Sequence, residues 1–474
     1  MALSKSILLN RRTLLAGGAA MFANTAAPRT FAAEPKTFDL VAAPAHMPIV
    51  GGAHSETEVW AYDGMVPGPE IRVRQGERLR ISVQNKLPEA TTVHCHGIRL
   101  PNAMDGVPDL TQRAVAPGET FTYEFECPDA GTFWYHPHTN SSAQVGRGLY
   151  GALIVEEREP PVVDREVVWV MDDWRLRDDG SIHPDFRNFH DIAHAGRLGN
   201  TVTVNGRVTD SFSVHSGERI RLRLINAANA RIFGLSFQEH SPLIIAIDGQ
   251  PVEPHPADAG RIVLAPGMRM DLILDLTGKP GQRYTVRDDY YSRASYPFLE
   301  LAYAKRALRD NVLDGGTRLA PNPLAEPDLD KAERLQVVLG GGMMGRMMTA
   351  IVNGREMDMR SMFQSGVAWA MNGIAATNHL HDPLLTFARD RSYVIELIND
   401  TAWPHPMHLH GHAFRVISRN GRAEPLRLWQ DTVLIPGREW AEIALVADNP
   451  GDWMFHCHIL EHQIAGMMGV VRVA

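Results

Sequence analysis

The chain has 474 residues, 44% of them hydrophobic and 22% charged, and a formal net charge of −8 at pH 7. The length predicts two or three domains, and the composition is that of a soluble globular protein without an apolar run long enough to span a bilayer. An acidic balance without any block of Lys and Arg excludes nucleic acids and anionic lipids as expected partners, and three cysteines are too few for a disulfide framework.

Residues 1–33 have the composition of an export signal. Arg11 and Arg12 form a twin arginine, a short and mildly apolar stretch follows over 14–20, and small residues suited to cleavage occur at 26–27 and 32–33. The alternative is an amphipathic N-terminus that contains Arg-Arg by chance. We expect a twin-arginine signal peptide and a periplasmic or otherwise exported protein. The segment holds four basic residues and no acid, so its removal lowers the formal charge from −8 to −12.

Three segments of the chain share one pattern, in which Gly or Asp is followed by alternating apolar and polar residues and then by Asn. They are GERLRISVQN (76–85), GERIRLRLIN (217–226) and DRSYVIELIN (390–399). Alternation with a period of two is typical of a half-buried strand. The repeat divides the chain into three β-rich copies, over 34–158, 159–310 and 325–474, with a linker over 311–324. Short strands separated by turn signals predict an all-β fold with one Greek-key sandwich per copy.

Histidine pairs spaced His-x-His stand at matched offsets in the first and third copies. Nine and eleven residues after the repeated Asn come His94/His96 and His408/His410; five and seven residues after a repeated turn glycine come His136/His138 and His456/His458. The second copy has Leu235, Phe237, Val286 and Asp288 at the same offsets. We therefore expect the second copy to be a spacer, and the chemistry to lie where the first and third copies meet.

The histidine pairs indicate a metal site but do not name the metal. Residues i and i+2 of a strand point to the same side, so each pair presents two imidazoles on one face. Imidazole suits copper, zinc, iron and nickel alike.

The last cluster, HCHILEHQIAGMM (456–468), is more specific. Cys457 must face away from its two neighbouring histidines, where its thiolate, His462, an upstream His405 and an axial Met467 make the ligand set of a blue-copper centre. Electrons can then pass from Cys457 through a few covalent bonds into His456 and His458. In the first copy Cys95 also lies between two histidines, but Leu100 and Asp105 stand where His462 and Met467 would be. Only the third copy can build this mononuclear site.

These motifs resemble those of the multicopper oxidase family, which includes laccases, ascorbate oxidases and bacterial cuprous oxidases. The resemblance covers the whole chain after residue 33 and rests on HCHG (94–97), HPH (136–138), HPMHLHGH (405–412) and HCHILEHQIAGMM (456–468). It implies three cupredoxin-like domains in tandem and four copper ions, of which one is type 1, one type 2 and two type 3. It also implies that O2 binds at the three-copper cluster and leaves as water after four electrons.

The resemblance assigns the ligands residue by residue. The type 1 copper takes His405, Cys457 and His462 with Met467 axial, the type 2 copper takes His94 and His408, and the type 3 pair takes His96, His136, His138, His410, His456 and His458. Asp105 matches an acid that the family places near the cluster to pass protons. Many bacterial relatives carry an acid directly after the second type 1 histidine, where this chain has Gln463, which leaves the second proton donor open; Glu461 is an uncertain substitute.

Several other residues allow two interpretations. Eight of the 20 methionines fall within 343–371, where soft thioethers can dock cuprous ions or pack a flexible core; we favour packing. Cys95 and Cys127 can form a disulfide after export, or Cys95 can be a small buried side chain facing away from copper. His183, His190 and His194 of the second copy have the context of a surface loop. Trp403 and Asp400 are candidates for the rim of the type 1 site.

The leading functional hypothesis is an oxidase that takes single electrons from phenols, aryl amines or metal ions and reduces O2. A cuprous oxidase for copper tolerance is a narrower alternative. Copper-dependent nitrite reduction would not require eight imidazoles in one chain, and a blue-copper carrier with a vestigial cluster would not be expected to keep every ligand. Because both halves of the cluster lie in one chain, we expect a monomer.

Overall fold

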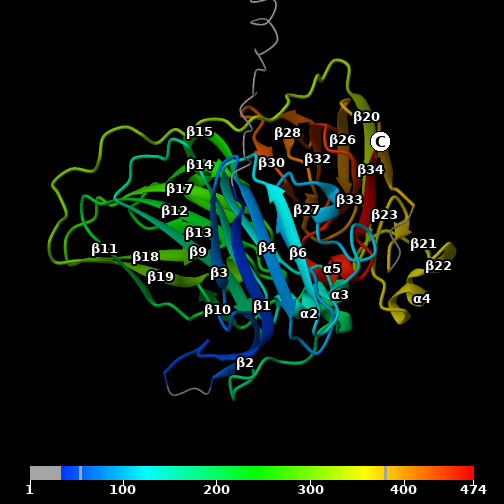
Figure 1. Cartoon of the computed structure of the whole chain (residues 1–474), viewed down its shortest axis with the longest axis horizontal. Helices are drawn as coiled ribbons and strands as arrows, with labels where there is room; N and C mark the ends of the chain where they lie inside the picture. The colour runs from blue at the N-terminus through cyan, green and yellow to red at the C-terminus, as the bar shows by residue number, and fades with distance from the viewer. Residues whose placement is uncertain (1–33, 53–55, 378–381) are drawn as a thin grey trace, which may run out of the picture. The chain divides into compact units, whose positions relative to one another are not determined.

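The structure is a computed structural model that describes residues 34–52, 56–377 and 382–474. The predicted signal peptide, 1–33, lies outside the described residues. Residues 35–474 form one compact unit of antiparallel and mixed sheets, shown in Figure 1. Among the described residues, no helix is both long and apolar enough to cross a membrane.

The first copy holds two four-stranded sheets. One has the order β2 (Thr57–Tyr62), β1 (Lys36–Met47), β4 (Arg78–Asn85), β6 (Thr120–Glu126), and the other β3 (Gly68–Arg74), β8 (Gly151–Glu156), β7 (Gly131–His136), β5 (His94–His96).

The second copy holds a six-stranded and a five-stranded sheet. Their orders are β10 (Thr201–Val204), β9 (Arg165–Trp174), β12 (Arg219–Asn226), β17 (Arg269–Asp275), β14 (Leu243–Ile247), β15 (Gln250–Pro256), and β11 (Ser211–Val214), β19 (Tyr296–Tyr303), β18 (Arg283–Asp288), β13 (Phe233–Phe237), β16 (Arg261–Leu264).

The third copy holds a ten-stranded and a five-stranded sheet. The first has the order β22 (Arg355–Asp358), β21 (Thr349–Val352), β24 (Ile374–Ala375), β23 (Trp369–Met371), β20 (Glu333–Gly341), β26 (Ser392–Asn399), β32 (Trp440–Val446), β28 (Phe414–Arg419), β29 (Arg422–Ala423), with β30 (Trp429–Gln430) paired to β28. The second has the order β25 (Leu385–Phe387), β34 (Met468–Val473), β33 (Gly451–Cys457), β27 (His405–Leu409), β31 (Thr432–Ile435).

Helical segments are short and lie in the connections. They are η1 (Asn102–Met104), α2 (Ser141–Val145), α3 (Phe189–Ala193), η2 (Asp258–Gly260), η3 (Ser292–Ala294), α4 (Met359–Gln364) and α5 (Leu460–Ile464).

The three copies share one strand connectivity, which confirms the predicted all-β repeat. In each, the first strand pairs parallel with the strand of the repeated segment, as β1 with β4, β9 with β12 and β20 with β26. The second sheet of each copy contains four strands in the same arrangement: the first two pair parallel, and the second with the third and the third with the fourth pair antiparallel. These strands are β3–β8–β7–β5, β11–β19–β18–β13 and β25–β34–β33–β27.

The repeated Asn at the end of each of these strands has a structural reason. Asn85, Asn226 and Asn399 are buried, and each side-chain amide donates to a carbonyl of the loop that follows and to a carbonyl 30 or more residues further along the chain, with N···O distances of 2.7–3.0 Å. Each amide oxygen accepts from the backbone N–H two residues on, in Leu87, Ala228 and Thr401. Because a buried loop must satisfy its backbone polar groups, this residue holds the turn that leads to the strand of the His-x-His motif.

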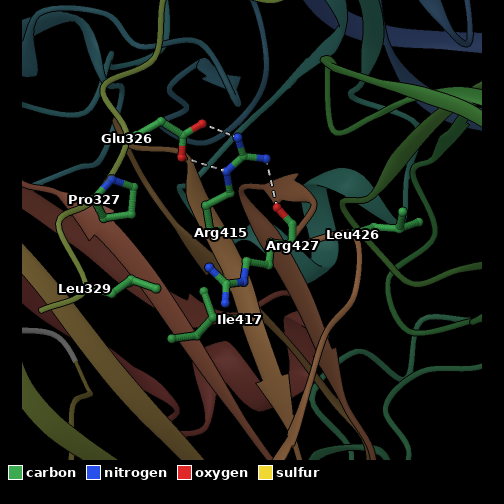
Figure 2. A pocket seen from close by; sticks show the side chains of 7 residues that line it. All are labelled: Glu326, Pro327, Leu329, Arg415, Ile417, Leu426 and Arg427. Carbon is green, nitrogen blue, oxygen red and sulfur yellow. Dashed lines mark hydrogen bonds and ion pairs between the residues drawn. The ribbon is translucent and has the colours of Figure 1, made fainter.

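The predicted linker carries no strand between β19 and β20, yet it is fastened to the body. Asn322 bonds the backbone of Ala130 through both its amide atoms, each at 2.9 Å, and Leu319 is buried. Just beyond, Glu326 pairs with Arg415 of β28, which also donates to the carbonyl of Arg427 at 2.8 Å (Figure 2). The surface pocket that these residues line lies at the third copy and contains none of the predicted ligands.

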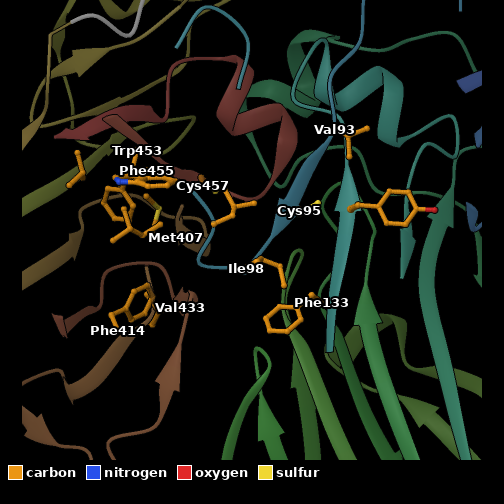
Figure 3. Close-up of a cluster of buried hydrophobic side chains, with 14 of the residues drawn as sticks. Val93, Cys95, Ile98, Phe133, Met407, Phe414, Val433, Trp453, Phe455 and Cys457 are labelled. Carbon is orange, nitrogen blue, oxygen red and sulfur yellow. The ribbon is translucent and has the colours of Figure 1, made fainter. Parts of the chain in front are cut away.

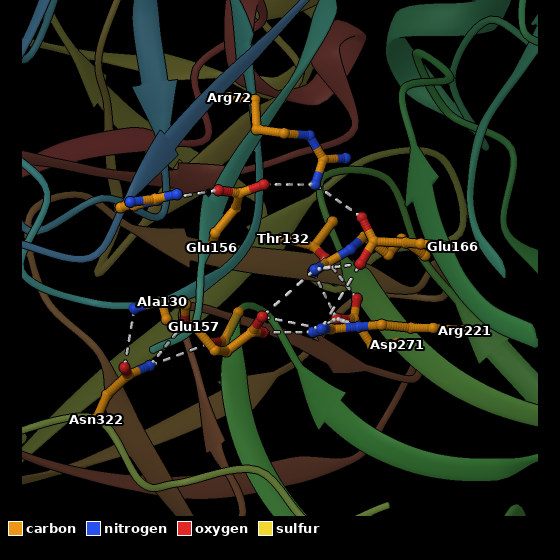
Figure 4. A network of polar contacts seen from close by, with 12 residues as sticks. Arg72, Ala130, Thr132, Glu156, Glu157, Glu166, Arg221, Asp271 and Asn322 are labelled. Carbon is orange, nitrogen blue, oxygen red and sulfur yellow. Dashed lines mark hydrogen bonds and ion pairs between the residues drawn. The ribbon is translucent and has the colours of Figure 1, made fainter. Parts of the chain in front are cut away.

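The first and second copies meet through a buried ionic network. Arg221 and Arg223 of β12 reach Asp271 of β17, and Arg221 also pairs with Glu157 at the end of the first copy (Figure 4). Thr132 of β7 donates to Asp271 at 2.5 Å. Removing one partner of such a network would leave an uncompensated buried charge, so the network specifies how the two copies pack.

Candidate metal centres

Strand register brings the four histidine pairs together. In the first copy His94 of β5 lies opposite His136 of β7, and in the third His408 of β27 lies opposite His456 of β33. The second member of three pairs, at 138, 410 and 458, lies just beyond the end of its strand. The strand prediction therefore holds for the first residue of each pair, and the strand ends place all eight rings in one buried cluster.

The cluster joins the first copy to the third. His94 stacks on His410 with ring centroids 3.9 Å apart, and His96 stacks on His408 at 3.7 Å. The ring of His458 lies 4.9 Å from that of His96. Three sets of histidines bring ligand atoms within 4.8 Å of one another: His94, His408 and His410; His94, His96 and His136; and His138, His410 and His456.

Backbone carbonyls fix the orientation of four of these rings. The Nδ1–H groups donate over 2.7–3.2 Å as follows: His94 to Asp105, His136 to Pro137, His408 to Asp431 and His456 to Cys457. This leaves each Nε2 unprotonated and directed inward. The Nε2 atoms of His94, His136, His138, His408 and His458 are buried without a hydrogen-bond partner among the described residues. Buried lone pairs that converge in this way fit bound metal ions, and the all-nitrogen donor set suits copper.

Burial keeps seven of the eight imidazoles neutral. It lowers the pKa of His456 to about 3 and lowers the pKa of the others below the usual range, namely His96, His136, His138, His408, His410 and His458. Neighbouring imidazoles act in the same direction, because each disfavours a positive charge on the next. The neutral ring is the form that binds a metal.

Asp105 lies between the two halves of the cluster. Its carboxylate accepts from Nδ1 of His410 at 2.9 Å and lies 3.2 Å from Nδ1 of His94, and the side chain is fully buried. The family resemblance predicts an acid near the cluster at this residue, and in the structure it contacts one histidine of the first copy and one of the third.

A second buried acid, Asp431, contacts the cluster and was not predicted from the sequence. Its carboxylate lies 3.1 Å from Nε2 of His96 and 3.3 Å from Nδ1 of His408. Burial alone would raise the pKa of Asp431, but the Arg269 guanidinium and His408 hold that pKa below its usual range. The only sequence signal is an acid directly before the apolar strand Thr432–Ile435, a context that many surface turns share.

The predicted mononuclear ligands also converge. Sγ of Cys457 lies 3.5 Å from Nδ1 of His405 and 3.7 Å from Nδ1 of His462, and the two Nδ1 atoms are 3.1 Å apart. Nε2 of His405 bonds the Thr401 hydroxyl at 2.9 Å, and Nε2 of His462 donates to the His194 carbonyl at 2.7 Å. With both Nε2 atoms engaged, both Nδ1 lone pairs point at the thiol. Such an arrangement calls for a cation between the three atoms.

Cys457 and Met467 lie on the apolar side of β33. Cys457 packs with Met407, Trp453 and Phe455 (Figure 3), and burial raises the pKa of its thiol. Met467 is fully buried, and its carbonyl accepts from the Cys457 N–H at 3.1 Å. The alternation predicted for His456, Cys457 and His458 is thus present, with the two rings in the histidine cluster and the thiol on the other face.

The mononuclear site is covered. His405, Cys457, His462 and Met467 are 0% exposed. Three residues, which we call the type 1 cover, lie over it: His194 after α3 of the second copy, Trp403, and Met343. Trp403 packs edge-on to His194 at 5.3 Å and donates from its indole N–H to the Met343 carbonyl at 2.9 Å. The prediction of a surface loop around His194 did not include this contact, in which the backbone carbonyl of His194 accepts from the predicted ligand His462.

Gln463 lies beside the cluster, whereas Glu461 lies elsewhere. The Gln463 amide is within 2.8 Å of the Ser141 hydroxyl and 3.3 Å of Nδ1 of His138. Glu461 accepts from the side chain of Asn229 and the backbone of Arg197, both at 3.0 Å and both in the second copy. Burial raises the pKa of Glu461. It therefore anchors α5 to the second copy.

The structure bears differently on the two open questions about sulfur: it shows no disulfide among the described residues, and it buries some of the methionines of 343–371 while leaving others exposed. Cys95 and Cys127 are buried free thiols without a disulfide between them. Met362 and Met371 are buried, and Met347, Met357 and Met359 pack on a small core around β21, β23 and α4. Met343, Met344 and Met348 are exposed, at 37, 67 and 76%.

Comparisons with known proteins identify the family. Three family descriptions of multicopper oxidase domains match residues 46–160, 165–306 and 353–474. Multicopper oxidase MmcO of Mycobacterium tuberculosis is 31% identical over 444 residues, which cover 86% of this chain and 81% of that protein. Copper resistance protein A of Escherichia coli is 26% identical, with 92% of each chain covered.

Solved structures are also similar. A multi-copper oxidase from Pseudomonas thermotolerans has a TM-score of 0.82 at 36% identity, covering 93% of this chain and 99% of that one. Lac15 from a marine microbial metagenome has a TM-score of 0.72 at 34% identity, with 92 and 99% covered. The chain belongs to the multicopper oxidase family and is an oxidoreductase of cupredoxin-like domains that binds four copper ions and couples one-electron oxidation of a donor to the reduction of O2 to water.

Proposed function

We propose that the four coppers are divided between the two sites in the way the motifs indicate. The type 1 copper is held by His405, Cys457, His462 and Met467, and the type 2 copper by His94 and His408. The type 3 pair takes the remaining cluster histidines: His96, His136, His138, His410, His456 and His458. The carrying observation is that Cys457 faces His405 and His462 while its two covalent neighbours lie in the eight-histidine cluster.

The chain's own residues supply the proton and access functions that this proposal needs. When bound, the type 1 copper takes single electrons from the donor and the three-copper cluster passes four of them to O2. Asp105 holds a proton position next to His94 and His410. A cavity lined by His138, Ser141 and Gln463 is the route that we propose for O2 and water.

The domain boundaries that we propose are 34–158, 159–310 and 325–474, with 311–324 as linker. Their support is the matched strand connectivity, in which each copy completes both its sheets from its own strands. We also propose that 1–33 is a twin-arginine signal, that the mature protein is exported, and that it acts as a monomer. Replacing Arg11 and Arg12 by Lys should retain the protein in the cytoplasm, and light scattering of the purified protein should give the mass of one chain.

Donors of the proposed enzyme are phenols, aryl amines or metal ions that give up electrons at the type 1 cover. None of the four ligands is exposed, so the donor contacts the cover and not the ligands. The experiment below measures a phenol and Cu(I) side by side.

The test is to load the purified protein with copper, count copper per chain, and record the visible spectrum and O2 uptake with a phenol and with Cu(I). Four coppers, strong blue absorption and O2 uptake that is lost in Cys457→Ser support the proposal. Cys95→Ala is the matched control, because Cys95 also lies between two cluster histidines but is not a proposed ligand; it should keep the blue colour. One copper without O2 uptake would contradict the proposal.

A further inference from the structure

The second copy carries no proposed copper ligand, yet it reaches the histidine cluster through Arg269, the first residue of β17. This guanidinium is 0% exposed. Its Nη1 and Nη2 donate to the two carboxylate oxygens of Asp431 at 2.8 and 2.6 Å, a bidentate pair. Its Nη1 and Nε also donate to the carbonyls of Gly267 and Thr132, both at 3.1 Å. Nη1 also lies 3.4 Å from a carboxylate oxygen of Asp248. The shortest of these contacts are the two to Asp431, which the other contacts hold in place.

Asp431 also contacts two histidines of the cluster. One carboxylate oxygen lies 3.1 Å from Nε2 of His96 and 3.3 Å from Nδ1 of His408, and the backbone carbonyl accepts from Nδ1 of His408 at 2.8 Å. His96 belongs to the first copy and His408 to the third. One acid thus orients two rings that stack on each other across the boundary between copies.

A second acid locks the backbone around this pair. Asp248, in the turn between β14 and β15, accepts from the N–H of Arg269 at 2.9 Å and from those of Asp431 and Thr432 at 3.3 and 3.2 Å. The starts of β17 and β31 are thereby held together. The arginine and the acid that it binds cannot shift independently.

The first copy closes the arrangement with a glycine. A Cβ on Gly97, directly after His96, would lie 2.3 Å from Nη2 of Arg269 and 2.5 Å from Oδ2 of Asp431, and φ is +87°. Any side chain there would displace the ion pair. A Cβ on Gly267 of the second copy would lie 2.6 Å from Cδ2 of His458. The backbone of the first copy at Gly97 is therefore packed against the ion pair, and the backbone of the second copy at Gly267 is packed against His458.

We propose that Arg269 is a positioning residue of the three-copper cluster: through Asp431 it holds His408 and His96 in the orientation that binds copper. This rests on the proposed ligand assignment. The second copy is then a structural part of the oxygen-reducing centre and more than a spacer. Groups that orient metal ligands from behind typically change metal affinity or activity by about 10- to 100-fold when they are removed.

The test uses Arg269→Met, which keeps the length of the side chain but removes its charge and donors, in the copper-loaded full chain. We expect the blue type 1 absorption to persist, because its ligands do not contact Arg269, while copper per chain falls below four and the type 2 electron paramagnetic resonance signal is lost or altered. O2 uptake should fall by about 10-fold or more. Arg269→Lys, which keeps the charge but loses the bidentate geometry, should lie between.

The matched control is Arg219→Met. Arg219 is another arginine of the second copy with a bidentate carboxylate partner, Asp275 at 2.6 and 2.9 Å, but it has no contact with Asp431 or the cluster. It should leave copper content and the type 2 signal unchanged. If Arg269→Met does not fold, the double variant Arg269→Met with Asp431→Asn removes both buried charges and is measured in the same way.

Four coppers and an unchanged type 2 signal in Arg269→Met, or in the double variant, would overturn the inference. Equal loss of the type 1 and type 2 signals would also overturn it, because that pattern indicates a general structural role. The wild-type protein separates this outcome from a failure of the proposed function: if the wild type itself lacks four coppers, the ligand assignment is at fault.

Discussion

Nε2 of His462 donates a hydrogen bond to the backbone carbonyl of His194 at 2.7 Å, and the two residues are 268 positions apart. The bond fixes the tautomer of a proposed type 1 ligand, so that its Nδ1 faces Cys457. It also means that the second copy covers the edge of the type 1 site. Electrons from a donor must cross this cover, and Trp403 and Met343 complete it.

Removing the indole of the cover should speed organic donors. In Trp403→Ala we expect kcat/KM for a phenol to rise by on the order of tenfold, equivalent to about 1.4 kcal/mol in the barrier, because the donor comes nearer to His462. The position of the blue absorption should not change, since no ligand is altered. Steady-state kinetics with a series of phenols checks this. A fall in kcat/KM for every donor would mean that the indole itself binds the donor or relays its electrons.

Copper loading of the type 1 site should release a proton. Burial raises the pKa of the Cys457 thiol and lowers that of His462 to about 3, so at neutral pH the metal-free site has a protonated thiol and neutral imidazoles. Binding needs the thiolate, so the affinity should rise about tenfold per pH unit between pH 6 and 8. Competition titrations with a copper chelator measure this slope. Cys457→Ser should abolish it, and a pH-independent affinity in the wild type would contradict it.

The metal-free protein should lose stability in mild acid. The pKa of His456 and of His462 is about 3 in the folded chain against 6.5 for an exposed histidine. Between these values the unfolded chain binds more protons, so the contribution is complete above pH 6.5 and is lost as the pH falls. Each group contributes a slope of about 1.4 kcal/mol per pH unit. Urea unfolding at pH 7.5, 6 and 5 tests this, and His456→Gln should give a shallower slope than the wild type.

Asp105→Asn should slow the reaction with O2 but spare the oxidation of the donor. The amide keeps the shape of the side chain but cannot take up and pass on a proton beside His94 and His410. We expect reoxidation of the fully reduced enzyme by O2 to slow by about 100-fold, the range of a lost proton donor. Reduction of the blue absorption by a phenol without O2 should keep its rate. Stopped-flow measurement separates the two, and equal slowing of both would point to lost copper.

Gln463→Glu should add a proton donor on the other side of the cluster. The side chain lies 3.3 Å from Nδ1 of His138 and 2.8 Å from Ser141, so a carboxyl group can occupy the same place. We expect reoxidation by O2 to quicken by up to about tenfold, below the full effect of general acid catalysis because Asp105 already serves the cluster. Glu461→Gln is the control and should leave this rate unchanged, since Glu461 contacts the second copy. No change in Gln463→Glu would mean that proton supply does not limit this step.

The ligands and the repeat were readable from the sequence because both depend on local spacing. The His-x-His spacing predicts two rings on one side of the chain and the thiol of Cys457 on the other, and this holds although the second histidine of three pairs lies just beyond its strand. The repeated Asn marks the loop before each motif strand, since its side chain satisfies that loop's backbone.

Tertiary structure alone decided which groups stand behind the ligands. Asp431 contacts His96 across 335 residues, and Arg269 reaches Asp431 across 162. The group that accepts from Nε2 of His462 is the backbone carbonyl of His194. Because every residue has such a carbonyl, the sequence does not reveal this contact. Such contacts depend on how three separate sandwiches pack, and packing leaves no fixed spacing along the chain. The sequence by itself therefore determined the class of enzyme and the residues that we propose as copper ligands, whereas only the packed structure brought residues of the second copy, Arg269 and His194, behind both groups of proposed ligands.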